Sequence, residues 1–211
     1  MRLTRTLLSL TLATVLVPDA SRAQSAQAWS VQVSGLYAAL FGEAYESFEA
    51  GPGFEAQLRY TTTTGWSFGA GYQRTSHEID FGDADLNSLD QDVSLAGAFV
   101  EPRYTFVVGS STTAFPYLSA RLSLLQQSIS LREESVGLDV SGSASGVNAN
   151  LGGGVLVRMT PRVNLDLGLT YGYTNFKDFT LRDRTTGETF SGSSGSGTNV
   201  IARVGLAIGL R

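Results

Sequence analysis

The 211-residue sequence contains no cysteine, only five prolines and a single histidine, His77. Without cysteine, disulfide scaffolds, thiolate zinc sites and thiol nucleophiles are excluded. No segment approaches the roughly 18 consecutive apolar residues of a membrane-spanning helix, which excludes a helical polytopic membrane protein. Charged residues make up 16% of the chain, below the roughly 25% usual in soluble proteins.

Glycine and aromatic residues are abundant: the chain has 24 glycines, 11 phenylalanines, 8 tyrosines and 2 tryptophans. This combination suits many short strands joined by turns. Hydrophobic residues make up 42% of the chain, which argues against disorder, and the length suits one domain.

Residues 1–23 have the parts of an export signal. Arg2 and Arg5 precede an apolar run, Leu7–Val17, and small residues at positions 21 and 23 mark a cleavage site after Ala23. We therefore predict a cleaved signal peptide, residues 1–23, followed by one domain, residues 24–211. An uncleaved anchor helix is the alternative, but a run of this length, at about 1.5 Å per residue, spans only about half of the hydrocarbon core.

Apolar and polar residues alternate with period two in eight segments: 29–41, 54–60, 66–73, 93–106, 115–126, 147–158, 163–173 and 199–210. In the third segment, for example, Trp66, Phe68 and Tyr72 share one face, opposite Ser67 and Gln73. Eight strands of about ten residues are therefore predicted.

The fourth segment departs from this pattern. Val93, Leu95 and Phe99 are out of phase with Val100 and Tyr104. Either a β-bulge or entry of the first half into a loop above the barrel would reconcile the two halves.

The connections alternate between long and short. Long polar connections cover residues 42–52, 76–91, 127–146 and 177–197, and short ones cover 61–65, 107–114 and 159–162. We interpret two low-complexity stretches, 141–146 and 192–197, as loop. All long loops then leave one end of an antiparallel up-and-down barrel, and both termini lie at the other end.

Volume decides which face of the strands points outward. The apolar face carries about 40 larger side chains, too many for the narrow interior of an eight-stranded barrel. A soluble lipocalin-like barrel, with its apolar face inside, is therefore disfavoured. The other face carries charges of both signs, and we predict that they form a network in the lumen: Glu55, Arg59, Glu101, Arg103, Arg121, Asp166 and Arg203. We interpret this polar interior as a plug.

Aromatic residues gather near both ends of the predicted strands and indicate two interfacial girdles. The short-turn girdle is predicted to contain Trp29, Tyr60, Trp66, Tyr104, Phe106 and Phe115, and the long-loop girdle Tyr37, Phe41, Phe54 and Tyr72. The general preference of aromatic residues for strands is the alternative explanation.

Four short motifs accompany the alternation: Glu101-Pro102-Arg103-Tyr104, Pro116-Tyr117, Gly152-Gly153-Gly154 and Thr160-Pro161. In this order, residues 28–211 resemble the small eight-stranded outer-membrane β-barrels such as OmpX and the membrane domain of OmpA. The resemblance implies a place in the outer membrane of a diderm bacterium, contact with its lipid and lipopolysaccharide, and insertion by the barrel assembly machinery. The chain departs from the family by ending in Leu210-Arg211, where an aromatic residue is usual.

No catalytic group is evident. His77 is followed by Glu78 and Ile79, so the His-x-Ser arrangement of lipid A deacylases is absent, and Ser76 would point to the opposite face of a strand. We therefore expect no enzymatic activity and a solvated loop histidine.

Cofactor motifs are incomplete. Asp83-x-Asp85-x-Asn87 matches the opening of a calcium loop, but Ser88 and Ser94 replace the glycine and glutamate that such a loop needs, so a solvated charge run is favoured over a weak metal site. The glycines at 152–154 lack the helix and lysine of a phosphate-binding loop. We expect them to let Tyr117 or Arg121 pass close to the backbone, and we expect no cofactor.

The sequence thus predicts a monomeric outer-membrane barrel with a structural or surface-interaction role. A narrow porin-like channel and a lipid A-modifying enzyme are the alternatives. Loss of the signal peptide leaves 12 basic and 18 acidic residues, a net charge of −6, which disfavours a nucleic-acid partner.

Overall fold

The computed structural model describes residues 28–79, 90–108, 113–133, 138–177, 179–183, 187–192 and 195–210. The predicted signal peptide, the candidate metal residues Asp83, Asp85 and Asn87, and the terminal Arg211 lie outside these residues. Within the described part of the chain, no helix is long and apolar enough to cross a membrane.

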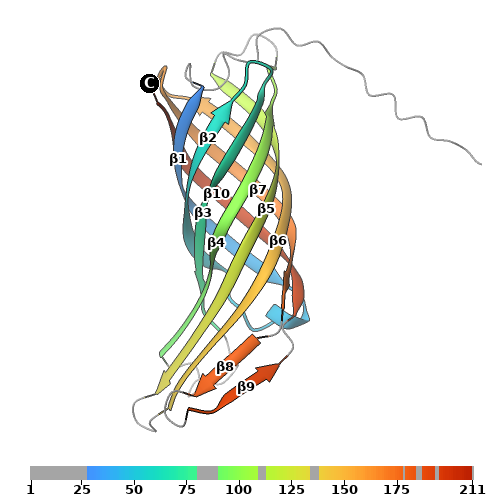
Figure 1. Cartoon of the computed structure of the whole chain (residues 1–211). Coiled ribbons are helices and arrows are strands. Elements are labelled where there is room, and N and C mark those ends of the chain that lie inside the picture. Colours follow the sequence, from blue (N-terminus) through green and yellow to red (C-terminus); the bar gives the residue numbers. More distant parts are fainter. Residues whose placement is uncertain are drawn as a thin grey trace, which may run out of the picture.

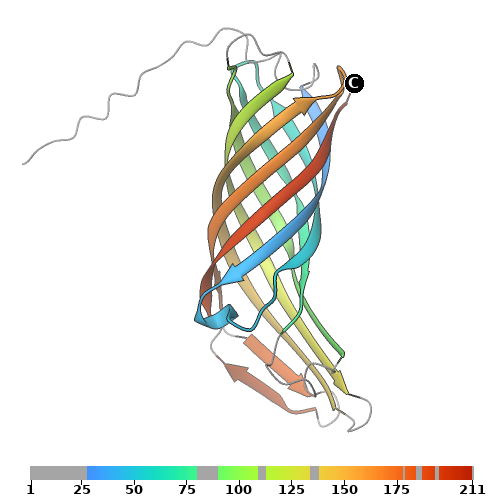
Figure 2. The ribbon, with the colours of Figure 1, turned by 180° about the vertical axis from the view of Figure 1, so that it is seen from behind.

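Eight strands in the described ranges form a closed barrel (Figures 1 and 2). They are β1 (Trp29–Phe41), β2 (Gly51–Thr61), β3 (Trp66–His77), β4 (Asp90–Thr105), β5 (Ala114–Glu133), β6 (Leu138–Arg158), β7 (Val163–Phe176) and β10 (Ser196–Gly209). Consecutive strands pair antiparallel, and β10 pairs with β1 to close the sheet. The predicted fold class, an eight-stranded antiparallel up-and-down barrel, is confirmed.

Three strands continue beyond the barrel at the long-loop end. The β5–β6 ladder runs as far as Glu133 opposite Leu138. A hairpin of β8 (Phe179–Asp183) and β9 (Thr189–Gly192) pairs with the extended part of β6 (Figure 1). The prediction of a loop over residues 127–146 was therefore wrong for residues 127–133 and 138–146, and the low-complexity residues 141–146 lie in β6. Their Ser- and Gly-rich sequence has little strand preference of its own, and the neighbouring strands supply its hydrogen-bonding partners.

The strand faces are inverted relative to a soluble barrel. Leu151, on the outside, is 70% exposed, whereas the inward carboxylates Glu55 and Asp166 are 0% exposed. Large hydrophobic side chains cover the outside, and most fully buried side chains are polar. The predicted direction of both faces is therefore confirmed.

β4 keeps one continuous phase along its length. Its register with β3 advances one residue at a time, from Trp66 opposite Tyr104 to His77 opposite Val93. Val93, Leu95 and Phe99 are buried and point inward, on the same side as Glu101 and Arg103. Both predicted explanations, the bulge and the loop, were therefore wrong. The apolar residues of the sequence change from inward to outward positions along β4, although the strand itself is regular. They do so because the lumen becomes apolar near the long-loop end.

The two aromatic girdles are present except at one position. Trp29 contacts Tyr60 with ring centroids 5.0 Å apart, and Trp66 contacts Tyr104 at 5.1 Å. Phe115 was wrongly assigned to the lipid-facing girdle, since it is 3% exposed. It lies two residues before the inward Tyr117, and period-two geometry puts both side chains in the lumen.

The two tryptophans of the chain, Trp29 and Trp66, test the placement of the short-turn girdle. In bilayers, we expect lipids brominated near the headgroup to quench their fluorescence more than lipids brominated near the chain end, because both rings are exposed at one end of the barrel wall. The variant W29F reports Trp66 alone and serves as the control. Stronger quenching by the deep bromines would contradict this placement.

Candidate functional site in the barrel lumen

Seven charged side chains meet in the middle of the lumen. They come from five strands: Glu55 and Arg59 from β2, Glu101 and Arg103 from β4, Arg121 from β5, Asp166 from β7 and Arg203 from β10. Each occupies an inward position of its strand, and all are buried. The closure of the barrel brings together residues up to 148 positions apart in the sequence.

Glu101 is the centre of this network. Its carboxylate accepts charged hydrogen bonds from Arg59 at 2.7 Å, Arg103 at 2.9 Å and Arg203 at 3.0 Å. Arg121 also donates to it, through Nε at 2.8 Å and through a second guanidinium nitrogen. Four arginines therefore surround one carboxylate, which removes most of the cost of burying it.

The other two carboxylates bridge the same arginines. Glu55 pairs with Arg121 at 2.7 Å and with Arg203 at 3.3 Å. Asp166 pairs with Arg103 at 3.1 Å and lies 3.6 Å from Arg203. All seven predicted residues thus belong to one ion-pair network of four positive and three negative charges.

Asp166 also links the network to neutral groups. The Tyr117 hydroxyl donates to it at 2.7 Å, and the Gln32 amide donates at 2.6 Å. The guanidinium of Arg103 stacks 3.9 Å above the Tyr117 ring, and that of Arg121 lies 4.0 Å above the Phe99 ring. These cation–π contacts hold the arginines in place from their apolar side.

Glycines make room for these bulky groups. A β-carbon at Gly154 would lie 2.5 Å from the Tyr117 hydroxyl, and one at Gly168 would lie 2.6 Å from it. The expectation that the glycines at 152–154 let Tyr117 pass close to the backbone is therefore confirmed for Gly154.

An amide layer lies between the charges and the long-loop end. Asn150 donates to Asn199 at 2.5 Å, Asn199 donates to the Thr174 hydroxyl at 2.8 Å, and Asn148 donates to the same hydroxyl at 2.7 Å. A void of about 20 Å³ adjoins this layer. It has room for about one water molecule.

A cluster of apolar side chains lies in the lumen near its long-loop end. We call this cluster the outer cap; its buried members are Leu40, Tyr45, Leu95, Leu125, Ala144 and Phe176, with Phe48 and Phe179 partly buried beside them. Tyr45 comes from the short helix η2 (Glu43–Tyr45) and donates a hydrogen bond to the Gly195 carbonyl at 3.4 Å. Burial raises the pKa of Tyr45 to about 12. Sequence reasoning missed the outer cap, although the phase change at Val93 and Leu95 signalled it.

A smaller apolar cluster lies at the short-turn end. Phe115, Tyr117 and Leu156 are buried together, and Val107 packs against them. The lumen is therefore layered, with the charge network and the amide layer enclosed between two apolar clusters.

His77 lies at the long-loop end of β3 and is 3% exposed, so the expectation of a solvated loop histidine was wrong. Its Nδ1–H donates to the Glu49 carbonyl at 2.9 Å, and Nε2 lies 3.0 Å from the Thr75 hydroxyl, which donates to it when the ring is neutral. Burial lowers the pKa of His77, and the bond to Glu49 opposes this only in part. Ser76 is exposed on the opposite face.

Three solved structures with this architecture cover most of the chain. Neisserial surface protein A is 20% identical, with 87% of this chain and 97% of that chain covered and a TM-score of 0.52. A major outer membrane protein of Thermus thermophilus is 12% identical, with 86% and 98% covered and a TM-score of 0.57. Ail of Yersinia pestis, solved with the heparin analogue sucrose octasulfate, is 14% identical, with 85% and 97% covered and a TM-score of 0.54. At these identities the likeness concerns the fold.

The sequence comparison supplies the family. No curated protein matches the chain significantly. The protein-family model described as the outer membrane protein beta-barrel domain matches residues 7–206, almost the whole sequence. Together with the closed barrel and its apolar outer face, this match shows that the chain belongs to the family of outer membrane protein beta-barrel domains.

Proposed function

We propose that this protein is a plugged outer-membrane barrel whose role is structural and surface-interactive, with no transport or catalytic function. The observation that carries the proposal is the layered lumen. The charge network fills the middle, and apolar clusters lie on both sides of it. An eight-stranded barrel has an interior only just wide enough for its own side chains, which leaves no path for a solute.

The surface role belongs to the long-loop end. Outer-membrane barrels carry short periplasmic turns and longer external loops, so we orient this end toward the outside. There the extended parts of β4, β5 and β6 and the hairpin β8–β9 project beyond the barrel (Figures 1 and 2). This added sheet supports a role in contacts with lipopolysaccharide or other surface partners, made by a monomer.

The barrel assembly machinery is a further partner that we propose. Leu210, next to the end of β10, is 40% exposed and continues the outward alternation of that strand. We propose that this machinery recognises the outward apolar side chains of β10 together with Leu210.

Catalysis by His77 is disfavoured by its contacts. Its Nδ1 is bound to a backbone carbonyl and not to a carboxylate, and the hydroxyl on Nε2 is that of the buried Thr75. A charge-relay arrangement needs an accessible nucleophile and an orienting acid.

Conductance tests the closed lumen. In planar bilayers we expect the protein to show no steady open-channel steps. The variant Y45A should remain closed as well, because it removes part of the outer cap and leaves the charge network in place. A steady ohmic conductance of the unaltered protein would favour the porin-like alternative.

The network can be tested by stability. We expect E101Q to lower the free energy of unfolding by about 3–5 kcal/mol, since it leaves four buried arginines with two carboxylates. The neighbouring V100A, on the lipid-facing side, is the matched control and should cost about 1 kcal/mol or less. Unfolding in urea measures the stability of both variants. It is followed on gels by the loss of the heat-dependent shift, the difference in mobility between the unboiled folded barrel and the boiled protein. Equal effects of the two variants would count against the network.

Because His77 is the single histidine of the chain, its titration with pH can be followed without overlap from other histidines. By NMR we expect His77 to titrate below pH 6.5, because burial lowers its pKa. Its contribution to stability is complete above about pH 6.5 and declines as the pH falls toward the lowered pKa. We expect H77A to leave the mass spectrum of lipid A unchanged; a lost lipid A modification would instead support the enzyme alternative.

A further inference from the structure

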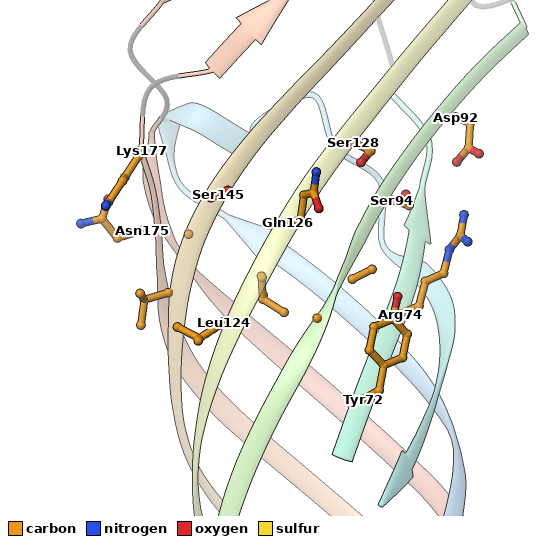
Figure 3. A pocket seen from close by; sticks show the side chains of 15 residues that line it. Tyr72, Arg74, Asp92, Ser94, Leu124, Gln126, Ser128, Ser145, Asn175 and Lys177 are labelled. Atoms are coloured by element: carbon orange, nitrogen blue, oxygen red, sulfur yellow. The ribbon is translucent and has the colours of Figure 1, made fainter. Parts of the chain in front are cut away.

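The outer wall of the barrel is hollowed toward the long-loop end. The concavity has a volume of about 900 Å³ and crosses the outside of β3, β4, β5, β6 and β7 (Figure 3). Because most of its lining side chains point away from the lumen, it is separate from the charge network.

Small residues on β4 create this hollow. Ser94 and Ala96 form its floor between larger side chains, Arg74 on β3 and Gln126 on β5. Gly97 lets β4 and β5 approach closely, since a β-carbon there would lie 1.9 Å from the Leu124 carbonyl oxygen. The small residues on β4 therefore account for the floor of the hollow.

The chemistry of the wall changes within one step along the strands. Tyr72, Ala98, Leu124 and Val147 are successive cross-strand neighbours and form an apolar row. Two residues nearer the long loops, the corresponding row is Arg74, Ala96, Gln126 and Ser145. Such a change from apolar to polar side chains marks the boundary between acyl chains and headgroups.

Two cations flank the polar part of the hollow. Figure 3 shows Arg74 on one side and Lys177 on the other, with Gln126 and Ser145 between them. The Lys177 amide donates to the Ser145 carbonyl at 2.9 Å, which ties Lys177 to the polar row. In the part of the chain that the structure describes, neither Arg74 nor Lys177 has an ion-pair partner. Four inter-strand spacings of about 4.8 Å separate the two residues, which places them roughly 19 Å apart along the sheet.

We propose that this concavity binds the headgroup of a phosphorylated glycolipid in the outer leaflet. Arg74 and Lys177 take anionic groups at the two ends of a sugar core, and Gln126 hydrogen-bonds the sugar. The acyl chains lie along Tyr72 and Leu124 on the apolar row. The proposal rests on the orientation given under Proposed function, with the long loops outside.

The remaining charge in the lining is consistent with this placement. Asp92 lines the hollow on the loop side and disfavours a phosphate there. The two phosphates therefore belong at the flanking cations, near the acyl boundary, where a phosphorylated lipid headgroup would present them.

Native mass spectrometry of the full, refolded barrel in neutral detergent tests the site, with bisphosphorylated lipid A as the probe. We expect the double variant R74Q/K177Q to lose affinity by roughly tenfold or more for each cation removed, because charged hydrogen bonds are lost. Two matched controls, R162Q in the third short turn and R182Q in β8, remove exposed cations elsewhere and should retain binding. The heat-dependent gel shift confirms that each variant is folded.

Two further probes distinguish a phosphorylated glycolipid from another phospholipid and from free phosphate. Phosphatidylglycerol should bind at least tenfold more weakly than lipid A, because it has a single phosphate and no sugar, and inorganic phosphate should not compete. Equal binding of phosphatidylglycerol and lipid A, competition by phosphate, or unchanged lipid A binding by R74Q/K177Q would each overturn the proposal. Conductance measures the plugged lumen independently, so failure of the lipid site is distinguishable from failure of the proposed function.

Discussion

The hydrogen bonding that closes the sheet between β1 and β10 is the constraint on which the rest of the structure depends. Hydrocarbon offers no partner for a backbone amide or carbonyl, so a sheet that crosses a membrane must close on itself. The continuous ladder from Ser30 opposite Gly209 to Phe41 opposite Thr198 meets this requirement. Closure with only eight strands then makes the interior narrow, and lipid outside makes the apolar face the outer one.

A narrow polar interior imposes its own requirement on charge. A carboxylate removed from water is tolerated only when several donors surround it, and Glu101 has four arginines. Glu55 and Asp166 join the same arginines to one another, so each ion pair depends on its neighbours. Such a network rigidifies the barrel as a whole, in keeping with a structural role.

One strand connects the lumen with the outer wall. On its inner side β4 contributes Leu95 to the outer cap and Glu101 to the charge network. On its outer side Ser94 and Ala96 are small and leave the hollow between β3 and β5. Because neighbouring residues of a strand face opposite sides, the sequence of β4 sets both features independently.

The number of barrel strands, the outward apolar face and the seven charged residues of the lumen could be predicted from the sequence, because each follows from period-two alternation and from volume. Which charges pair could not be predicted, since closure of the barrel sets the distances between the strands. The same closure buries Phe115 and His77, places residues 127–133 and 138–146 in strands and gathers the apolar outer cap inside the barrel. In each of these cases a neighbouring strand or loop supplies the contacts, and these neighbours are distant in the chain.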